Sequence, residues 1–432
     1  METDDIVLKR LPVNLRPFLV LLGGVFCMIT FGTVYTFGNL LPYLVSYYRW
    51  KSNPDMTAGS MIWLQTLMSG FPMGMVVGGI IERKLGGRKG AMLGSFMYTF
   101  AMAMTFYTVQ HSYSATLLSM GWHPGRVGMA GGVIIGGYGC GAFILSPIQT
   151  TYINPLDYRV NADGFFTQVD LLERVPYVFL VMAGFFVFMQ TIGLLFVGPP
   201  SEDHDNETDS LIDTMDQADV HKQRVWSQMR TSAFVILFIS LMMNGLWVQL
   251  TSGLYKTYGQ KFIDSDFFLS LVGSMSSVFN AGGRVVWGAI ADEASYQSSM
   301  AVVCTLGAVL SWSLPLVKNI GNDYLFLATI CTMFSCVGGT FSLFPYVTHR
   351  FFGKTNFGVV YGFLQCSLSI AGVFAGLLSQ FILPKIGYES LFLVSGGFMA
   401  ISLTLTMFLH CTDVVRGLEQ DPVRRDTIES YG

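Results

Sequence analysis

Charged side chains are scarce in this sequence of 432 residues. Lys, Arg, Asp and Glu together make up 12% of it, about half the share that soluble domains carry. Hydrophobic residues make up 52%, which is typical of a polytopic membrane protein. The net charge of −3 excludes the strongly basic surface that nucleic-acid binding needs, so we expect no nucleic-acid partner.

Catalytic and metal-binding motifs are also missing. The seven cysteines form no CxxC pair and lie in or at the ends of apolar runs, so neither a zinc site nor a disulfide framework is predicted. There is no HExxH, GxSxG or P-loop sequence, and no pair of acids inside a span. We therefore expect no enzyme, no metal and no cofactor.

The chain divides into two apolar halves between polar segments. An acidic stretch at 199–230, poor in large apolar residues, reads as a cytosolic linker. The first residues do not show the charged region, apolar region and small-residue cleavage site of a signal peptide in that order. We therefore expect the first span to be retained. The predicted parts are a cytosolic amino terminus at 1–17, an amino-terminal helical bundle at 18–198, this linker, a six-helix bundle at 231–411 and a cytosolic tail at 412–432.

The apolar runs predict an all-α polytopic membrane protein. In the first half they cover about 18–48, 57–81, 91–120, a glycine-rich run to 152, and 176–197. In the second half they cover 231–259, 267–290, 299–317, 323–347, 357–384 and 388–411.

One deep cation lies in the span at 267–290. Arg284 costs ~2.5–3.5 kcal/mol at membrane depth, so it is expected to face a cavity where it meets an anion. Asn280 precedes it by one helical turn and shares its face. We find no other charged residue as deep in a span, and Lys256, near the outer end of its span, is expected to snorkel to the interface.

A short pattern recurs at the end of the second span of each half. Gly78-x-x-x-Glu82 is matched by Gly288-x-x-x-Asp292. The pattern indicates an internal duplication, typical of transporters, in which glycine permits close helix packing. Coincidence in a glycine-rich chain is the alternative.

These residues carry a resemblance to a known family. The pattern from Gly78 through Glu82-Arg83, followed by Gly-Gly-Arg88-Lys, resembles the signature of the major facilitator superfamily. The segments at 32–38, 124–142, 279–288 and 344–362 are similar to the oxalate/formate antiporter and monocarboxylate transporter group. The resemblance implies the major facilitator fold of two helical bundles, alternating access and a substrate site near the bilayer midplane. It also implies conformational gating by Gly78, Glu82, Arg83, Arg88, Gly288 and Asp292.

Two residue types depart from that resemblance. Monocarboxylate transporters usually carry an aspartate where this chain has Asn280, and an amide cannot titrate. We therefore expect exchange or facilitated diffusion rather than tight proton symport. The oxalate/formate relatives use a second cation, a lysine in span eleven, whereas the polar residue near mid-span here is Gln365. A single cation suits a monoanion, and the predicted substrate-binding residues are Arg284, Asn280, Tyr35, Asn39 and Gln365.

The first half is short by about one span. Glu82 and Pro124 are 42 residues apart, whereas Asp292 and Gly353 are 61 apart, a difference of 19. We therefore predict eleven clear membrane helices, with most of the family's helix four missing. After a long helix from about Lys89 to Thr108 or beyond, the chain is expected to return irregularly; two short crossings joined by a hairpin near Gln110–Ser112 are the alternative.

The predicted function is secondary active or facilitative transport of a small organic monoanion, such as a monocarboxylate, across a membrane. Arg284 is expected to bind the carboxylate, assisted by Tyr35 and Asn39. The alternative is a non-transporting sensor or scaffold, or an inactive variant, with a transporter fold. We expect the plasma membrane rather than an organelle membrane, and the sequence leaves open whether an accessory membrane subunit binds.

Overall fold

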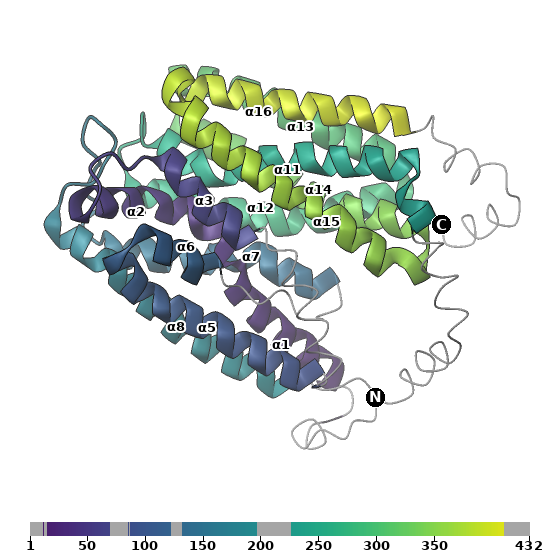
Figure 1. The fold of residues 1–432 in the computed structure, drawn as a ribbon, viewed down its shortest axis with the longest axis horizontal. Helices are drawn as coiled ribbons and strands as arrows, with labels where there is room; N and C mark the ends of the chain where they lie inside the picture. Colours follow the sequence, from purple (N-terminus) through teal and green to yellow (C-terminus); the bar gives the residue numbers. More distant parts are fainter. Residues whose placement is uncertain are drawn as a thin grey trace, which may run out of the picture.

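The computed structural model describes residues 12, 15–69, 85, 87–121, 132–196 and 226–409. Helices make up nearly all of these residues, and they contain no strand. The described residues include seven helical segments that are long and apolar enough to cross a membrane. The predicted all-α class is therefore confirmed (Figure 1).

The helices of the amino half are α1 (Arg16–Phe31), the 3-10 helix η3 (Gly32–Thr36), α2 (Phe37–Lys51), α3 (Ala58–Ser69), α5 (Gly87–His111), α6 (Tyr113–Gly121), α7 (Gly132–Ile153) and α8 (Val169–Phe196). Those of the carboxyl half are α11 (Ser232–Gly259), α12 (Asp266–Glu293), α13 (Tyr296–Ile320), α14 (Asp323–Phe352), α15 (Lys354–Leu377), the π-helix η5 (Leu378–Ile382) and α16 (Leu383–Phe408).

Side-chain caps explain where four carboxyl-half helices begin. An oxygen of the residue before each helix accepts a hydrogen bond from a backbone N–H in the first turn, which would otherwise be unsatisfied. The capping residues are Thr231, Ser265, Ser295 and Asn322. Gly321 ends α13 at φ +67°, a left-handed conformation that favours glycine.

The helices pack in two groups that correspond to the two halves. In the amino half, α1 packs on α7 and α8, and α5 packs on α8; in the carboxyl half, α11, α13 and α16 pack together, as do α12 and α14 (Figure 1). The groups meet where α7 lies on α12 and α3 lies on α15. A Cβ added at Gly139 would lie 3.1 Å from the Cα of Ala281, so small residues let α7 and α12 approach closely.

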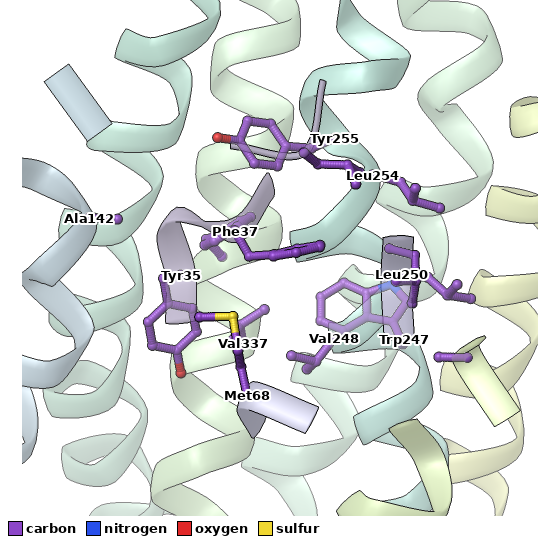
Figure 2. Close-up of a cluster of buried hydrophobic side chains, with 14 of the residues drawn as sticks. Tyr35, Phe37, Met68, Ala142, Trp247, Val248, Leu250, Leu254, Tyr255 and Val337 are labelled. Carbon is purple, nitrogen blue, oxygen red and sulfur yellow. The ribbon is translucent and has the colours of Figure 1, made fainter. Parts of the chain in front are cut away.

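An apolar cluster fills the space between the groups. Figure 2 shows Tyr35 and Phe37 of the amino half in one cluster with Trp247 of α11 and Val337 of α14. Trp247 is fully buried, and its indole Nε1 donates to Ser311 Oγ at 2.7 Å. Because the indole has its hydrogen-bond partner, its bulk packs here without leaving a polar atom unsatisfied.

The segment after α5 forms a hairpin near the position of the predicted alternative, not the irregular return. It is helical from Tyr113 to Gly121 and forms a hairpin with α5, in which the hydroxyls of Thr108 and Ser119 lie 2.8 Å apart. Nine residues of helix cover only ~13 Å, less than half of a hydrocarbon core. The count of eleven helices stays a prediction, because residues 70–84 and 122–131 lie outside the described ones.

The described residues do not test the packing role that the repeat suggested for Gly288. A Cβ at this position would meet no described atom within 4 Å. The glycines that permit close packing of α12 are Gly283, which lies earlier on α12, and Gly338, which lies on α14. A Cβ at Gly283 would lie 2.5 Å from the carbonyl oxygen of Ser335, and one at Gly338 would lie 2.2 Å from that of Asn280.

The close approach of α14 to α12 at Gly338 predicts a large effect of a single methyl group. Gly338→Ala should destabilise the protein by about 1–3 kcal/mol, because the backbone atoms it meets cannot rotate away. A thermal-shift measurement in detergent should show a lower melting temperature. Gly282→Ala is the matched control, since a Cβ there meets no described atom within 4 Å. Equal melting temperatures for the two variants would contradict this packing.

The hairpin between α5 and α6 gives a test of topology. His111 ends α5, and Tyr113 at the start of α6 donates from its hydroxyl to the carbonyl of Ser60, beside the turn at 52–57. If α5 crosses once from the cytosolic basic loop, His111→Cys should react with an impermeant maleimide from outside intact cells. Ser298→Cys, exposed at the opposite end of α12 and α13, should react only after permeabilisation. The reverse labelling pattern would show that the orientation is inverted.

Candidate functional site

Arg284 lies at the meeting point of three elements. Its Nη2 donates to the Tyr35 hydroxyl of η3 at 2.9 Å, and its Nε donates to Asn280 Oδ1 at 3.3 Å. The guanidinium carbon lies 5.4 Å from the centre of the Phe341 ring on α14, a cation–π distance. The predicted inward-facing cation is therefore half-buried between the two halves.

Asn280 shares the face of Arg284, as the one-turn spacing predicted. Its side chain is fully buried, and its Nδ2 has no hydrogen-bond partner in the described part of the chain. Buried polar atoms nearly always have a partner, so this donor marks a position for a ligand or water.

The structure separates Tyr35 from Asn39. Their spacing would align them on an α-helix, but residues 32–36 form the tighter 3-10 helix η3, which places residues differently. Tyr35 contacts Arg284, whereas the Asn39 amide donates to Gln149 Oε1 at 3.2 Å and to Thr150 Oγ1 at 3.1 Å on α7. Asn39 therefore joins a different cluster.

The other predicted residues have fewer described contacts. Gln365 is half-buried on α15, and its side chain makes no hydrogen bond within the described residues. Gly78, Glu82 and Arg83 lie outside those residues, as does the side chain of Arg88. Asp292 is exposed near the end of α12. The gating roles of these residues stay predictions.

A second buried cation was missed by the sequence analysis. Lys256 on α11 has no exposed surface, so the expectation that it snorkels to the interface is wrong. Its Nζ lies 2.8 Å from Asp266 Oδ1, 2.8 Å from Asn39 Oδ1 and 3.3 Å from the Tyr43 hydroxyl. Because the ammonium group has these partners inside the protein, it does not need to reach water.

Asp266 completes this group, which we call the Lys256 cluster: Asn39, Tyr43, Asn154, Lys256 and Asp266. The other carboxylate oxygen of Asp266 accepts hydrogen bonds from the Tyr43 hydroxyl and, at 3.0 Å, from Asn154 Nδ2. Asp266 is the first residue of α12, where the helix dipole favours a negative charge. The apolar run begins one residue later, at 267, so hydropathy did not indicate a buried acid.

The two cations occupy separate places on or beside α12. Arg284 follows Asp266 by 18 residues, which corresponds to ~27 Å along the helix axis. The Lys256 cluster lies at the end of the molecule that holds residues 52–57, 154–168 and 260–265, which we call the loop end.

A cavity of about 690 Å³ opens at the loop end. Pro42 and Thr257, the chain neighbours of Tyr43 and Lys256, line it together with Arg159, Lys261 and Ser379. Neither Arg284 nor any member of the Lys256 cluster lines this cavity, which reaches only the chain neighbours of the cluster.

Comparisons with known proteins agree with the architecture. The model of the Major Facilitator Superfamily matches residues 114–373. "Apicoplast pyruvate carrier 1" of Toxoplasma gondii is 25% identical, over 88% of this chain and 86% of its own. "Oxalate:formate antiporter" of Oxalobacter formigenes is 25% identical, over 67% of this chain and 63% of its own.

A solved structure shows the same fold. The crystal structure of a D-xylose-proton symporter has a TM-score of 0.65, with 10% identity, over 91% of this chain and 97% of its own. The sequence-based resemblance to the family and to its oxalate/formate and monocarboxylate group is thereby confirmed. The protein is a multi-pass membrane transporter and not an enzyme, and since the family model spans more than half of its length, the chain belongs to the major facilitator superfamily.

Proposed function

We propose that this protein carries a small organic monoanion, a monocarboxylate such as pyruvate, by alternating access. The observation that supports this proposal best is the half-buried guanidinium of Arg284, beside the unpartnered Nδ2 of Asn280. Two of the relatives are named as carriers of pyruvate and of oxalate and formate, which are small organic anions.

The chemistry of the Arg284 site fits a carboxylate. A guanidinium can donate two parallel hydrogen bonds to the two oxygens of a carboxylate. The contacts from Arg284 to Tyr35 and Asn280 are to neutral oxygens, so neither of them supplies the negative charge that a substrate would bring. Asn280 Nδ2 offers a further donor at the same place.

Contacts between the halves support alternating access. At the loop end, Arg159 and Asp264 form an ion pair at 2.7 Å, and Asp157 accepts from Ser265 Oγ at 2.9 Å. With the Lys256 cluster, these contacts hold the loop end closed. The positive-inside pattern of the chain orients the loop end outward, so we assign a state closed to the outside.

The proposed arrangement of the two halves and the linker is the one that the sequence predicts. We propose that the halves at 18–198 and 231–411 move against each other, joined by a cytosolic linker at 199–230. We place the protein in the plasma membrane. One relative is named as an apicoplast carrier, so an organelle membrane is the alternative location. Microscopy of a tagged protein distinguishes it from the plasma membrane.

A second candidate function is a sensor or scaffold that does not transport. The short hairpin favours it, because α6 as described extends over nine residues only. Uptake of labelled pyruvate into proteoliposomes that contain the purified protein separates the two functions. Uptake no faster than in empty liposomes would favour the non-transporting protein.

The guanidinium geometry predicts the effect of a charge-conserving change at position 284. Arg284→Lys should lower uptake by about 10-fold to 100-fold, because hydrogen bonds to a charged group contribute about 1.5–3 kcal/mol and Lys lacks the planar fork. Arg174→Lys is the matched control, since this half-buried residue pairs only loosely with Asp170 at 3.8 Å. Full uptake by a well-expressed Arg284→Lys protein would exclude the proposed role.

The residue at position 280 sets how uptake responds to pH. In Asn280→Asp, an ionised carboxylate would occupy Arg284 and compete with the substrate, whereas protonation would release the cation. Uptake should therefore rise more steeply in this variant than in the parent as the outside pH falls. Asn322→Asp, an exposed helix cap that aspartate replaces well, should keep the parent's pH profile. Superimposable profiles for all three proteins would contradict this prediction.

A further inference from the structure

We propose that the cavity of about 690 Å³ at the loop end, which we call the loop-end cavity, is a binding site for an organic carboxylate with an apolar body. A molecule bound there holds the loop end closed. The site is separate from the Arg284 site, because Arg284 does not line the cavity. Binding is independent of the proposed transport, whereas the inhibition of uptake that follows from it rests on the proposed alternating access.

The size and the apolar walls of the cavity suit such a molecule. Small-molecule sites in proteins usually have volumes of ~300–1,000 Å³, and the loop-end cavity lies within this range. Among its lining residues, Val45, Ile263 and Leu383 are buried and Tyr388 is half-buried. These side chains offer apolar surface to a hydrocarbon or aromatic body.

The beginning of α3 supplies donors for an anion. Thr57, Ala58 and Gly59 line the cavity, and α3 runs from Ala58 over twelve residues. Thr57 Oγ1 caps the helix by accepting from the backbone N–H of Ser60 at 3.2 Å. The backbone N–H groups of Ala58 and Gly59 make no hydrogen bond within the described residues. Free N–H groups in the first turn, together with the helix dipole, favour a negative group at this place.

A buried hydroxyl lies against this helix end. Ser379 lines the cavity and has no exposed surface, and its Oγ has no hydrogen-bond partner in the described part of the chain. A Cβ built at Gly59 would collide with the carbonyl oxygen of Ser379, so the two residues are in close contact. Ser379 belongs to the π-helix η5, a rare geometry that is frequent at functional sites. Its unpartnered hydroxyl marks a position for a ligand or water.

The end of α11 contributes further donors. Gln260 and Thr257 line the cavity, and both amide atoms of Gln260 and the Oγ1 of Thr257 are buried without a partner among the described residues. Carbonyl oxygens at a helix end repel an anion, but those of Tyr258 and Gly259 already accept hydrogen bonds from the backbone N–H groups of residues 261–263. The amide and the hydroxyl are therefore the groups of α11 that remain for a carboxylate.

The charged residues lie at the exposed rim of the cavity. Arg159 and Asp264 neutralise each other in an ion pair at 2.7 Å. Lys261 lies 5.1 Å from the centre of the Tyr388 ring and forms no ion pair with a described residue. Asp163, the remaining acid of the lining, is exposed to water. Because the acid is solvated whereas the unpartnered donors are buried, the interior favours an anion over a cation.

Both halves of the protein form the walls. The amino half contributes the beginning of α3, part of α2 and residues 159–165, and the carboxyl half contributes the end of α11, η5 and the beginning of α16. The cavity therefore has this lining only while the halves meet at the loop end. A ligand that binds one of two states shifts the population toward that state. In the proposed alternating access, a bound carboxylate slows uptake from the loop side.

Thermal shift of the purified full-length protein in detergent tests binding, with phenylacetate as the probe. Phenylacetate should raise the melting temperature in a concentration-dependent way, because a ligand of the folded state stabilises it. Acetate lacks the aromatic body and 2-phenylethanol lacks the carboxylate, so each should need about tenfold more ligand, or above, for the same shift. Equal potency of phenylacetate and 2-phenylethanol would overturn the assignment of a carboxylate.

The serine of η5 separates a binding role from a structural one. Ser379→Ala should weaken phenylacetate binding by about threefold or more and raise the melting temperature of the free protein, because an unpartnered buried hydroxyl is removed. Ser395→Ala is the matched control: this serine is equally buried, but its Oγ donates to the carbonyl of Phe392 at 2.8 Å. The control should keep the affinity and lower the melting temperature. Parental affinity with a lower melting temperature in Ser379→Ala would overturn the role of Ser379.

Two further variants test the polar groups near the rim. Gln260→Leu should weaken phenylacetate binding by about fivefold or more, and Lys261→Met by about threefold or more. Lys51→Met is the control for Lys261, since Lys51 is also exposed and lies 5.7 Å from the Trp50 ring but does not line the cavity. Parental affinity in well-folded Ser379→Ala, Gln260→Leu and Lys261→Met proteins would overturn the site.

Labelling of a cysteine behind the closed loop end tests the effect of binding. Ser270 is buried on α12, one turn beyond Asp266, so Ser270→Cys should react with an impermeant maleimide on the loop side only when the loop end opens. Its rate is divided by that of Asp55→Cys, an exposed residue outside the cavity lining. Saturating phenylacetate should lower this ratio by about threefold or more. An unchanged ratio at saturation would overturn the proposed closure.

Arg284→Lys distinguishes this site from the proposed function. The Arg284→Lys protein should bind phenylacetate as the parent does. Loss of binding in Arg284→Lys, with parental binding in Ser379→Ala, would assign phenylacetate to the Arg284 site and reject the loop-end site while keeping the proposed function. Binding that requires Ser379 in a protein that takes up no pyruvate would reject the proposed function and keep the loop-end site.

Discussion

The cost of placing a charge away from water shapes the interior of this protein. A half-buried cation, Arg284, and a fully buried one, Lys256, compensate for this cost differently. The described contacts of Arg284 include two neutral oxygens and an aromatic face, which solvate its charge. Lys256 has a carboxylate at 2.8 Å and is neutralised. The first arrangement is consistent with the anion-binding role proposed for Arg284, whereas the second satisfies the charge of Lys256 within the protein.

Helix α12 joins the two arrangements. It begins at Asp266 and carries Asn280 and Arg284 further along, and it packs on α7 of the other half and on α14 of its own. Close backbone contacts hold it: a Cβ at Gly338 would lie 2.2 Å from the carbonyl oxygen of Asn280. Tight packing on both sides leaves little room for α12 to bend, so a shift at one end is transmitted toward the other.

The sequence was sufficient for contacts that depend on local periodicity. Asn280 and Arg284 share a helix face because they are one turn apart, and the structure joins them. It was not sufficient for contacts between distant segments. Lys256 and Asp266 lie across a turn on two helices, and Tyr43 and Asn154 reach them from the other half. Hydropathy placed Asp266 just outside a span, and the 3-10 geometry at 32–36 separated Tyr35 from Asn39.

The position of the two cations constrains how the halves move. Tyr35 contacts Arg284, and Asn39 contacts Lys256, although the two amino-half residues are only four positions apart. One short segment of the amino half thus touches both cation sites of the carboxyl half. A rotation that withdraws α2 from Lys256 also displaces η3 from Arg284, because the two elements are continuous. In the proposed alternating access, opening at the loop end and rearrangement at Arg284 would therefore be parts of one movement.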